Sequence, residues 1–426
     1  MIDDTRTETG DLKGGKRLRS KRIALRVLAL VAVAALVAGA CSKKTNTGSS
    51  GSPGGTTTKT VKIEFFGALS GDYKLLVIHG FQAAKLAFDQ ANAGAFGKLP
   101  VKITFEGNDT GGSGTQASPL ADKVVSDPSV VGIIGPAFSG ESAATGDKFD
   151  QAGIPFITPS ATDDALATHG WTHWFRGVGN NSDEAKPAAQ SIQNILAPNC
   201  TFVASDGSAY GHGLAAIVQS FLSDQGAKVE NEEQVQPGQK DYSALVSKIA
   251  SSGCKAVFYG GYSPEGGLIR KQMTDQGLSK VTLLGGDGLK DDTFLSTAGN
   301  AGEGTLAVCP CVSPTDLASA GAANADAITK FISDYKAKFG EDPGIYALEG
   351  WDIANIYISA FKAGKITRDA ITSYVQGLTN FIGLAKTYSW QPDGELFPSD
   401  RVMYLYQDKG GQWAFLGNAA DLAAGG

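Results

Sequence analysis

Polar side chains that could hold a small ligand follow two apolar, strand-like runs in the first half of the chain. The segments 135–140 (GPAFSG) and 158–162 (TPSAT) each offer hydroxyl groups and successive backbone N–H groups. Several neutral donors of this kind can satisfy carboxylate oxygens without a buried cation. Because Ser and Thr also cap ordinary helices, each segment alone is a weak signal. Together they indicate a binding site for a carboxylate group.

The second half of the chain carries two tyrosines and an aspartate in similar strand-end loops. Tyr210 lies in SAYG, Tyr262 in YGGY and Asp287 in GGDG. A carboxylate flanked by glycines at the mouth of a cleft suits an ammonium group, since desolvation strengthens that ion pair. Aromatic rings can wall the aliphatic part of a ligand and cover the ammonium. The alternative for Asp287 is a turn aspartate, but the three features together favour a ligand-binding role.

The most enzyme-like signal is the string GHGLAA at 211–216, with Glu230 nineteen residues after its first glycine. This spacing matches a dinucleotide-binding motif. However, a loop separates the string from the preceding strand-like run TFVAS, so the tight turn that the motif requires is missing. We expect no nucleotide cofactor here. An exported α/β enzyme that uses this string remains an alternative.

Other catalytic patterns are absent from the sequence. His169 and His173 are four residues apart, but Gly170 lies between them and no glutamate follows His169, so they do not form a zinc-protease helix. The chain has four histidines in all, and it has neither a phosphate loop nor a GxSxG nucleophile elbow. The sequence therefore favours binding over catalysis, with no metal and no cofactor.

The first forty residues predict export. A basic cluster ending at Arg26 precedes an apolar run at 27–40, the order of a signal peptide. Fourteen helical residues span about 21 Å, short of the roughly 30 Å membrane core, so a permanent transmembrane helix is the weaker interpretation. The ending VAGAC resembles a bacterial lipobox, which makes Cys41 the candidate lipidation site, although Ala38 stands where Leu is usual. A cleaved, unanchored protein is the alternative.

The chain after the signal peptide is acidic. Residues 41–59 are poor in apolar side chains and are expected to form a flexible tether. Without the eight basic and four acidic residues of 1–40, the chain has 29 basic and 39 acidic residues, a formal charge of −10. Such a balance is not typical of nucleic-acid binding. We expect a protein held at the outer face of the cytoplasmic membrane.

The remaining cysteines are even in number, which suits an oxidising exterior. Cys200 and Cys254 each come just before a strand-like run, so neighbouring parallel strands would bring them together as a disulfide. Cys309 and Cys311 have only Pro310 between them and could form only a small, strained ring. Two cysteines at this spacing are also a poor start for a tetrahedral zinc site.

Short β-rich runs alternate with helical patterns from Lys59 onward. This alternation predicts two doubly wound parallel-sheet lobes of α/β class, with a ligand cleft between them. We expect an N-terminal lobe at 60–182 plus 313–366 and a C-terminal lobe at 183–312 plus 367–426. The expected helices are 81–92, 117–126, 142–152, 214–225, 242–251, 267–276, 325–339 and 347–363.

Six motifs in order resemble the branched-chain amino acid binding proteins of ABC importers, over about residues 62–416. They are GALSG at 67–71, GPAFSG at 135–140, GIPFITPSAT at 153–162, SAYGHGLA at 208–215, FYGGYSPEGG at 258–267 with Arg270, and GGDG at 285–288. These relatives are type I periplasmic binding proteins, whose two lobes are joined by a three-stranded hinge. The resemblance implies the same fold here and an amino acid ligand.

The resemblance also assigns roles to residues. Ser139 and Thr162, with nearby N–H groups such as that of Ala161, would bind the ligand carboxylate, and the Ser160 carbonyl would accept from the amine. Asp287 would hold the ammonium, while Tyr210 and Tyr262 close over the ligand.

Two segments depart from the family. Asp287 stands where the relatives carry Glu, which makes its carboxylate one methylene shorter. The segment 72–80 is shorter and more apolar than usual.

The expected function is capture of a branched-chain or other aliphatic amino acid between the lobes. The protein, expected to be a monomer without catalytic activity, would deliver the ligand to a membrane permease driven by separate ATPase subunits. The first alternative is the same scaffold binding an amide, a urea or an aromatic acid, for import or for sensing.

Overall fold

The computed structural model describes residues 58–423, and this part of the chain forms one compact unit. The expectations for the signal peptide 1–40, for Cys41 and for nearly all of the tether lie outside the described residues. None of the helices in this described part is both long and apolar enough to span a membrane.

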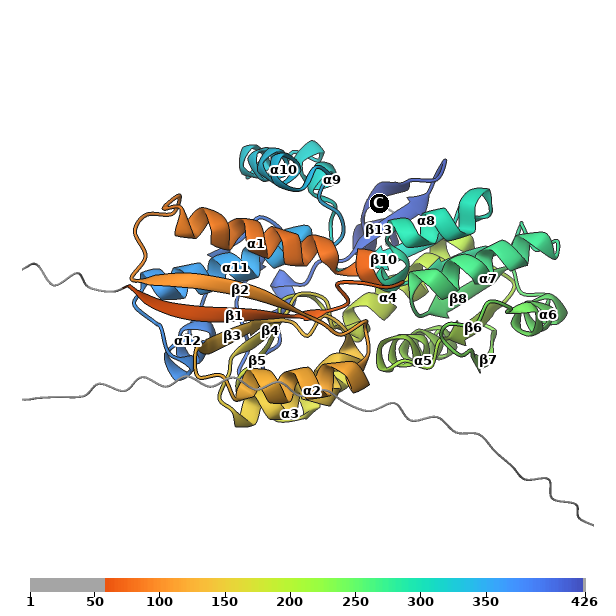
Figure 1. Cartoon of the computed structure of the whole chain (residues 1–426). Helices are drawn as coiled ribbons and strands as arrows, with labels where there is room; N and C mark the ends of the chain where they lie inside the picture. Colours follow the sequence, from red (N-terminus) through yellow and green to blue (C-terminus); the bar gives the residue numbers. More distant parts are fainter. Residues whose placement is uncertain (1–57, 424–426) are drawn as a thin grey trace, which may run out of the picture. The chain divides into compact units, whose positions relative to one another are not determined.

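The first lobe is built on a five-stranded parallel sheet with the order β2-β1-β3-β4-β5. Its strands are β1 (Lys59–Gly67), β2 (Val101–Asp109), β3 (Val130–Ile134), β4 (Phe156–Thr158) and β5 (Trp174–Arg176). One face packs against α1 (Ile78–Asn92) and α11 (Ala347–Lys362), and the other against α2 (Gly114–Val125) and α3 (Ser139–Gln151) (Figure 1). Buried on both faces, β3 is apolar along its whole length, as expected of a central parallel strand.

The second lobe has a seven-stranded sheet with the order β14-β13-β10-β9-β8-β6-β7. Its parallel strands are β6 (Thr201–Ser205), β7 (Val229–Gln234), β8 (Ala256–Gly260), β9 (Thr282–Gly285) and β10 (Leu306–Cys309). The edge is completed by antiparallel β13 (Tyr404–Asp408) and β14 (Trp413–Asn418). Helices α4 (Asn181–Ser191) and α5 (Ala209–Asp224) cover one face, and α6 (Ser243–Ser252), α7 (Ser263–Asp275) and α8 (Asp292–Ala298) cover the other. The predicted pair of doubly wound sheets is confirmed.

The chain passes between the two sheets three times within the described residues: after β5, after β10 and before β13. After the second crossing, α9 (Pro314–Ser319) and α10 (Ala325–Phe339) lead back to the first lobe, where α10 packs on α1.

The predicted lobe boundary after residue 366 is wrong, because the residues that follow it contact the first lobe. Helix α12 (Arg368–Gln376) packs on β3 and α11 of the first lobe. The Arg368 guanidinium donates to the carbonyls of Asp127, Val130 and Ala152 at 2.8–3.0 Å. The following hairpin, β11 (Phe381–Ile382) and β12 (Thr387–Tyr388), also joins the first lobe, because the Tyr388 hydroxyl donates to Asp352. The chain therefore returns to the second lobe only near β13.

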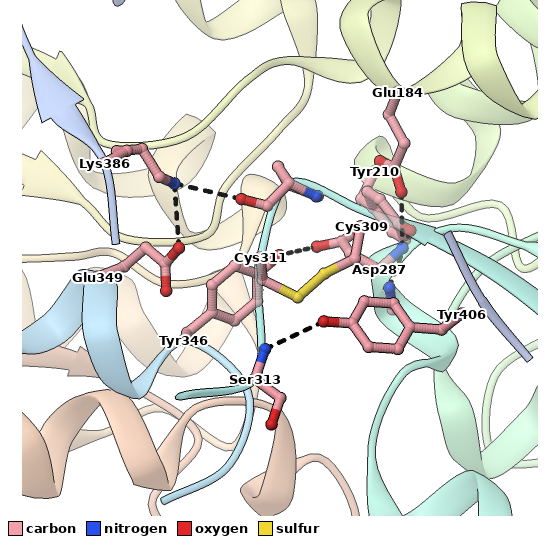
Figure 2. Close-up of a disulfide and its surroundings, with 12 residues drawn as sticks. Glu184, Tyr210, Asp287, Cys309, Cys311, Ser313, Tyr346, Glu349, Lys386 and Tyr406 are labelled. Carbon is pink, nitrogen blue, oxygen red and sulfur yellow. Dashed lines mark hydrogen bonds and ion pairs between the residues drawn. A yellow bond between two sulfur atoms is a disulfide. The ribbon is translucent and has the colours of Figure 1, made fainter. Parts of the chain in front are cut away.

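Two disulfides are present in the described chain. Cys200 and Cys254 are joined, with a Cα–Cα distance of 4.8 Å, as the expected pairing of β6 beside β8 requires. Glu230 lies beside this bond. Cys309 and Cys311, the other two disulfide candidates, are also joined to each other and form the small ring that their spacing allows. It lies at the second crossing between the lobes, where β10 ends (Figure 2).

Candidate functional site

The carboxyl ends of the strands in both sheets face a small cavity of ≈ 20 Å³, room for about one water molecule. Five of the residues predicted from the sequence line this cavity: Ser139, Ser160, Tyr210, Tyr262 and Asp287. Five lining side chains that the sequence analysis did not assign to the site are Leu76, Val77, Ala137, Phe138 and Tyr346. Ala161 and Thr162, also predicted, lie in the adjoining turn and do not line the cavity.

The polar end of the cavity is the beginning of α3. Ser139 is the first residue of this helix, so the N–H groups of its first turn have no partner within the helix. The Thr162 hydroxyl is buried without a hydrogen-bond partner. The Ala161 N–H, in contrast, donates to Thr158 Oγ1 at 3.0 Å. Ser139 Oγ accepts from the N–H of Asp163 at 3.2 Å, which leaves its own hydrogen free to donate. A helix N-terminus with such hydroxyl donors suits an anion, and the N–H groups of the first turn of α3, Ser139 and Thr162 can donate to it.

A buried arginine holds the 160–163 turn in place. Arg176 donates from Nη1 to the carbonyl of Ala161 at 2.6 Å and from Nη2 to that of Asp163 at 2.9 Å. The same guanidinium pairs with Glu395 at 2.8 Å, and both side chains are buried. Glu395 lies in the stretch of chain before β13, where the chain crosses between the lobes for the third time. The ion pair therefore connects this crossing to the site.

Asp287 marks the opposite end of the cavity. It begins the single-turn 3₁₀ helix η4 (Asp287–Leu289) and is buried. Its Oδ2 accepts from the Tyr346 hydroxyl, while its Oδ1 is buried without a hydrogen-bond partner. Burial raises the pKa of the carboxyl, and the hydroxyl groups of Tyr346 and Tyr210 oppose that rise. An unpaired oxygen of this kind is suited to a ligand cation.

Aromatic and aliphatic side chains form the walls. Tyr210 and Tyr262 stack with ring centroids 5.2 Å apart, and Phe138 meets Tyr262 edge-on at 5.3 Å. Leu76 and Val77 come from the short apolar segment 72–80, which folds into the 3₁₀ turn η1 (Lys74–Leu76) just before α1. The departure noted in the sequence thus supplies an apolar wall.

The lobes contact one another around the cavity. Tyr346 of the first lobe donates to Asp287 of the second. The Tyr73 hydroxyl donates to Glu265 Oε1 at 3.2 Å, and its ring meets Tyr262 edge-on at 5.4 Å. The cavity is small because these side chains fill the space between the lobes.

Three aromatic residues of the cavity wall each stand at the N-cap of a helix. Phe138, Tyr262 and Tyr346 are the N-cap residues of α3, α7 and α11. Tyr346 has a left-handed backbone, φ 59°. Tyr346 stands immediately before the predicted helix 347–363, and this position is the signal that could have identified it. The helix predicted at 142–152 begins too late to mark Phe138 in the same way.

The motifs set aside in the sequence have structural roles. Gly211 lies in the first turn of α5, after the N-cap Ser208, and a Cβ added there would lie 2.5 Å from the Gly260 carbonyl oxygen. The glycine therefore permits close packing of α5 on β8. His169 stacks on Trp171, with ring centroids 4.2 Å apart, and His173 Nδ1 lies 2.8 Å from Asp150, so each histidine has its own partner.

Two doubly wound sheets with a site between their strand ends define a two-lobed solute-binding protein. A family described as periplasmic binding protein matches residues 60–412, and the chain belongs to this family. A Leu/Ile/Val-binding protein of Rhizobium johnstonii is 31% identical over 302 residues, covering 70% of this chain and 82% of that protein. A Leu/Ile/Val-binding protein of Citrobacter freundii is 32% identical, covering 59% of this chain and 68% of the relative.

Solved structures share the fold. A leucine-binding protein of Thermotoga maritima superposes with a TM-score of 0.76 at 22% identity, covering 84% of this chain and 98% of that one. A branched-chain amino acid transporter substrate-binding protein of Streptococcus pneumoniae, in complex with isoleucine, has a TM-score of 0.74 at 24% identity, covering 84% and 100%. A solute-binding protein of R. palustris in complex with benzoate has a TM-score of 0.73 at 20% identity, covering 84% of this chain and 96% of that one. Since isoleucine and benzoate differ in chemistry, the shared fold alone does not select a ligand.

Proposed function

We propose that this protein is the extracytoplasmic solute-binding component of an ABC importer and that its ligand is an aliphatic α-amino acid. The relatives at 31% and 32% identity are both Leu/Ile/Val-binding proteins. The observation that carries the proposal is that one cavity has an anion-binding group at one end and a cation-binding group at the other. The N-terminus of α3 with Ser139 suits a carboxylate, and the free oxygen of Asp287 suits an ammonium.

The electrostatics of the site favour an amino acid over an aromatic acid. Asp287 and the Glu184 carboxyl behind it are buried, and neither forms an ion pair with Lys or Arg within residues 58–423. An acid such as benzoate brings no cation to this end, so it would leave the Asp287 charge uncompensated. An amide could still donate an N–H group there, and it remains the second candidate ligand.

Capture proceeds by closure. The ligand docks by its carboxylate on the first lobe, and closure then adds Asp287, Tyr210 and Tyr262 from the second. Only a ligand that bridges both lobes gains from closure, as a differential affinity for the closed state requires. The closed lobes then present their paired surface to a permease, and the chain itself carries out no catalysis. Lipidation at Cys41 would keep it beside that permease.

Titration calorimetry with three related ligands tests the proposal. L-leucine carries both charged groups, 4-methylpentanoate lacks the ammonium, and isoamylamine lacks the carboxylate. We expect leucine to bind far more tightly than the other two. The substitution Asp287→Asn should weaken leucine roughly 30- to 4,000-fold, because it truncates a buried charge pair. It should not weaken the binding of 4-methylpentanoate, because that ligand has no ammonium group to pair with Asp287.

Asp241→Asn is the matched control, since Asp241 is exposed on the same lobe, and it should bind leucine as the unmodified protein does. Binding of amides or benzoate, with no amino acid bound below millimolar concentration, would refute the proposed ligand class. Equal losses for leucine and 4-methylpentanoate would show that Asp287 does not bind the ammonium.

A further inference from the structure

A second carboxyl group lies directly behind Asp287. Glu184 is in the first turn of α4 and is fully buried. Its Oε1 accepts from the backbone N–H of Asp287 at 2.6 Å, and its Oε2 is buried without a hydrogen-bond partner. Figure 2 shows Glu184 reaching toward Asp287 from the side opposite Tyr346. Each of the two carboxyls thus keeps one buried oxygen free.

The backbone is shaped to allow this close approach. A Cβ added at Gly286 would lie 2.5 Å from Glu184 Oε1 and 2.5 Å from the Tyr210 hydroxyl oxygen. At Gly288 it would lie 2.5 Å from the Gly261 carbonyl oxygen. Gly286 is therefore required for the contact of Asp287 with Glu184, and Gly288 is required for the close approach of the Gly261 carbonyl.

The surroundings supply no positive charge to either carboxyl. Three tyrosines face the pair: Tyr210, Tyr262 and Tyr346, whose own pKa values are raised by burial, so they remain neutral. The charged groups on neighbouring elements are engaged elsewhere or exposed. Glu349 pairs with Lys386, Asp183 pairs with Arg401, Lys290 lies over the Tyr406 ring, and Asp421 is exposed.

Two adjacent carboxylates in a dry, cation-free site do not both ionise at neutral pH. Burial raises the pKa of Glu184 well above its usual value, and the Asp287 charge raises it further. The pKa of Asp287 is also raised by burial. The contact between the two residues and the upward direction of both pKa values therefore favour a pair that retains a proton.

We propose that Glu184 and Asp287 hold one proton between them in the ligand-free protein, and that the ligand's ammonium group competes with that proton for the pair. Glu184 is then a positioning residue: because it shares the proton with Asp287, binding of the ligand cation is coupled to release of that proton. On binding, the O–H bond of the shared acid breaks, the proton passes to solvent buffer, and the ammonium takes its place beside the carboxylates. The ligand keeps its own protons, and no electron is transferred.

This inference rests on the proposed function, since it needs a ligand with an ammonium group. It adds that affinity increases with pH, even for a ligand whose own charge is constant. One linked proton changes the dissociation constant by up to tenfold per pH unit. The protein would accordingly hold its ligand less tightly in acid.

Calorimetry of L-leucine binding between pH 5.5 and 8.5, in pairs of buffers with different ionisation enthalpies, counts the protons released. We expect a release of up to one proton near neutral pH and a dissociation constant that falls as pH rises. Glu184→Gln keeps the acceptor for the Asp287 N–H but cannot share a proton, so it should release none at pH 7 and show a flat pH profile. The matched control is Asp352→Asn, which removes another fully buried carboxyl, hydrogen-bonded away from the cavity. It should keep the unmodified profile.

A measurement on the ligand-free protein tests the shared proton separately from the proposed amino acid ligand. Carboxyl-carbon NMR of the protein alone should show a coupled pair that titrates above the usual carboxylate range, and the coupling should vanish in Glu184→Gln. If leucine fails to bind while the pair titrates in this way, the proposed ligand is wrong and the proton pair stands. If leucine binds without releasing a proton, or if Glu184→Gln releases as many as the unmodified protein, the inference is overturned.

Discussion

The buried pair of Arg176 and Glu395 offers the sharpest test of how the site is held together. Arg176 has no exposed side-chain surface and Glu395 has 5%. The guanidinium also satisfies the carbonyls of Ala161 and Asp163. Substituting Arg176→Met keeps much of the apolar stem but removes every one of these donors.

The magnitude follows from what the substitution leaves behind. Breaking a buried ion pair costs about 3–5 kcal/mol, because one charge remains without a partner. Each buried carbonyl without a donor adds about 1–3 kcal/mol, reduced where water enters. We therefore expect Arg176→Met to lower the free energy of unfolding by about 5–8 kcal/mol. Glu395→Gln, which leaves both carbonyls satisfied, should cost about 3 kcal/mol.

Urea unfolding followed by tryptophan fluorescence measures these losses, and the double variant completes the cycle. Since Arg176→Met/Glu395→Gln has neither buried charge, its loss should be about 2 kcal/mol smaller than the sum of the single losses. Under conditions where Arg176→Met is folded, leucine should bind it more weakly, because the 160–163 turn has lost its anchor. Additive losses, or a loss below about 1 kcal/mol for Arg176→Met, would refute the reasoning.

Two further predictions concern single buried groups. Tyr346→Phe removes the hydroxyl that donates to Asp287, so leucine affinity should fall roughly tenfold or more in calorimetry, with little change in melting temperature; a large loss of stability with intact binding would contradict this. Burial raises the pKa of Asp352 from 3.8 to about 7, so the folded state binds a proton that the unfolded state releases between these values, and stability should fall as pH rises from about 4 to 7. Asp352→Asn should remove that part of the slope in urea unfolding measured across this pH range, and an unchanged slope would argue against it.

The alternation of strands and helices made the architecture predictable, but the beginnings of several helices were placed too late. Helix α3 begins at Ser139 rather than 142, α5 at Ala209 rather than 214, and α7 at Ser263 rather than 267. The early turns contain Gly, Ser and Pro, residues with low helix propensity that read as loops. In these three cases the strand-end loop and the first helical turn are one segment, so the misplaced residues adjoin the site.

The site residues that belong to a local sequence motif could be predicted, whereas those that reach the site only through tertiary packing could not. Ser139, Tyr210 and Asp287 stand in glycine-rich strand-end loops, and all three line the cavity. Tyr346 and Glu184 reach Asp287 from positions about sixty and one hundred residues away in sequence. Their contacts with Asp287 depend on tertiary packing, and no local pattern marks Glu184. The lobe boundary after 366 failed for a similar reason, since the position of α12 depends on Arg368 reaching carbonyls on β3 and neighbouring loops.

The contacts that Tyr73 and Tyr346 make across the cavity bear on the speed of capture. With these contacts in place the cavity is ≈ 20 Å³, so a solute of several heavy atoms enters only after they separate. The observed association rate should therefore level off at high solute concentration, at the rate at which the two lobes part. The same side chains that delay entry also slow escape, which gives the bound solute a long residence time while the protein diffuses to its permease.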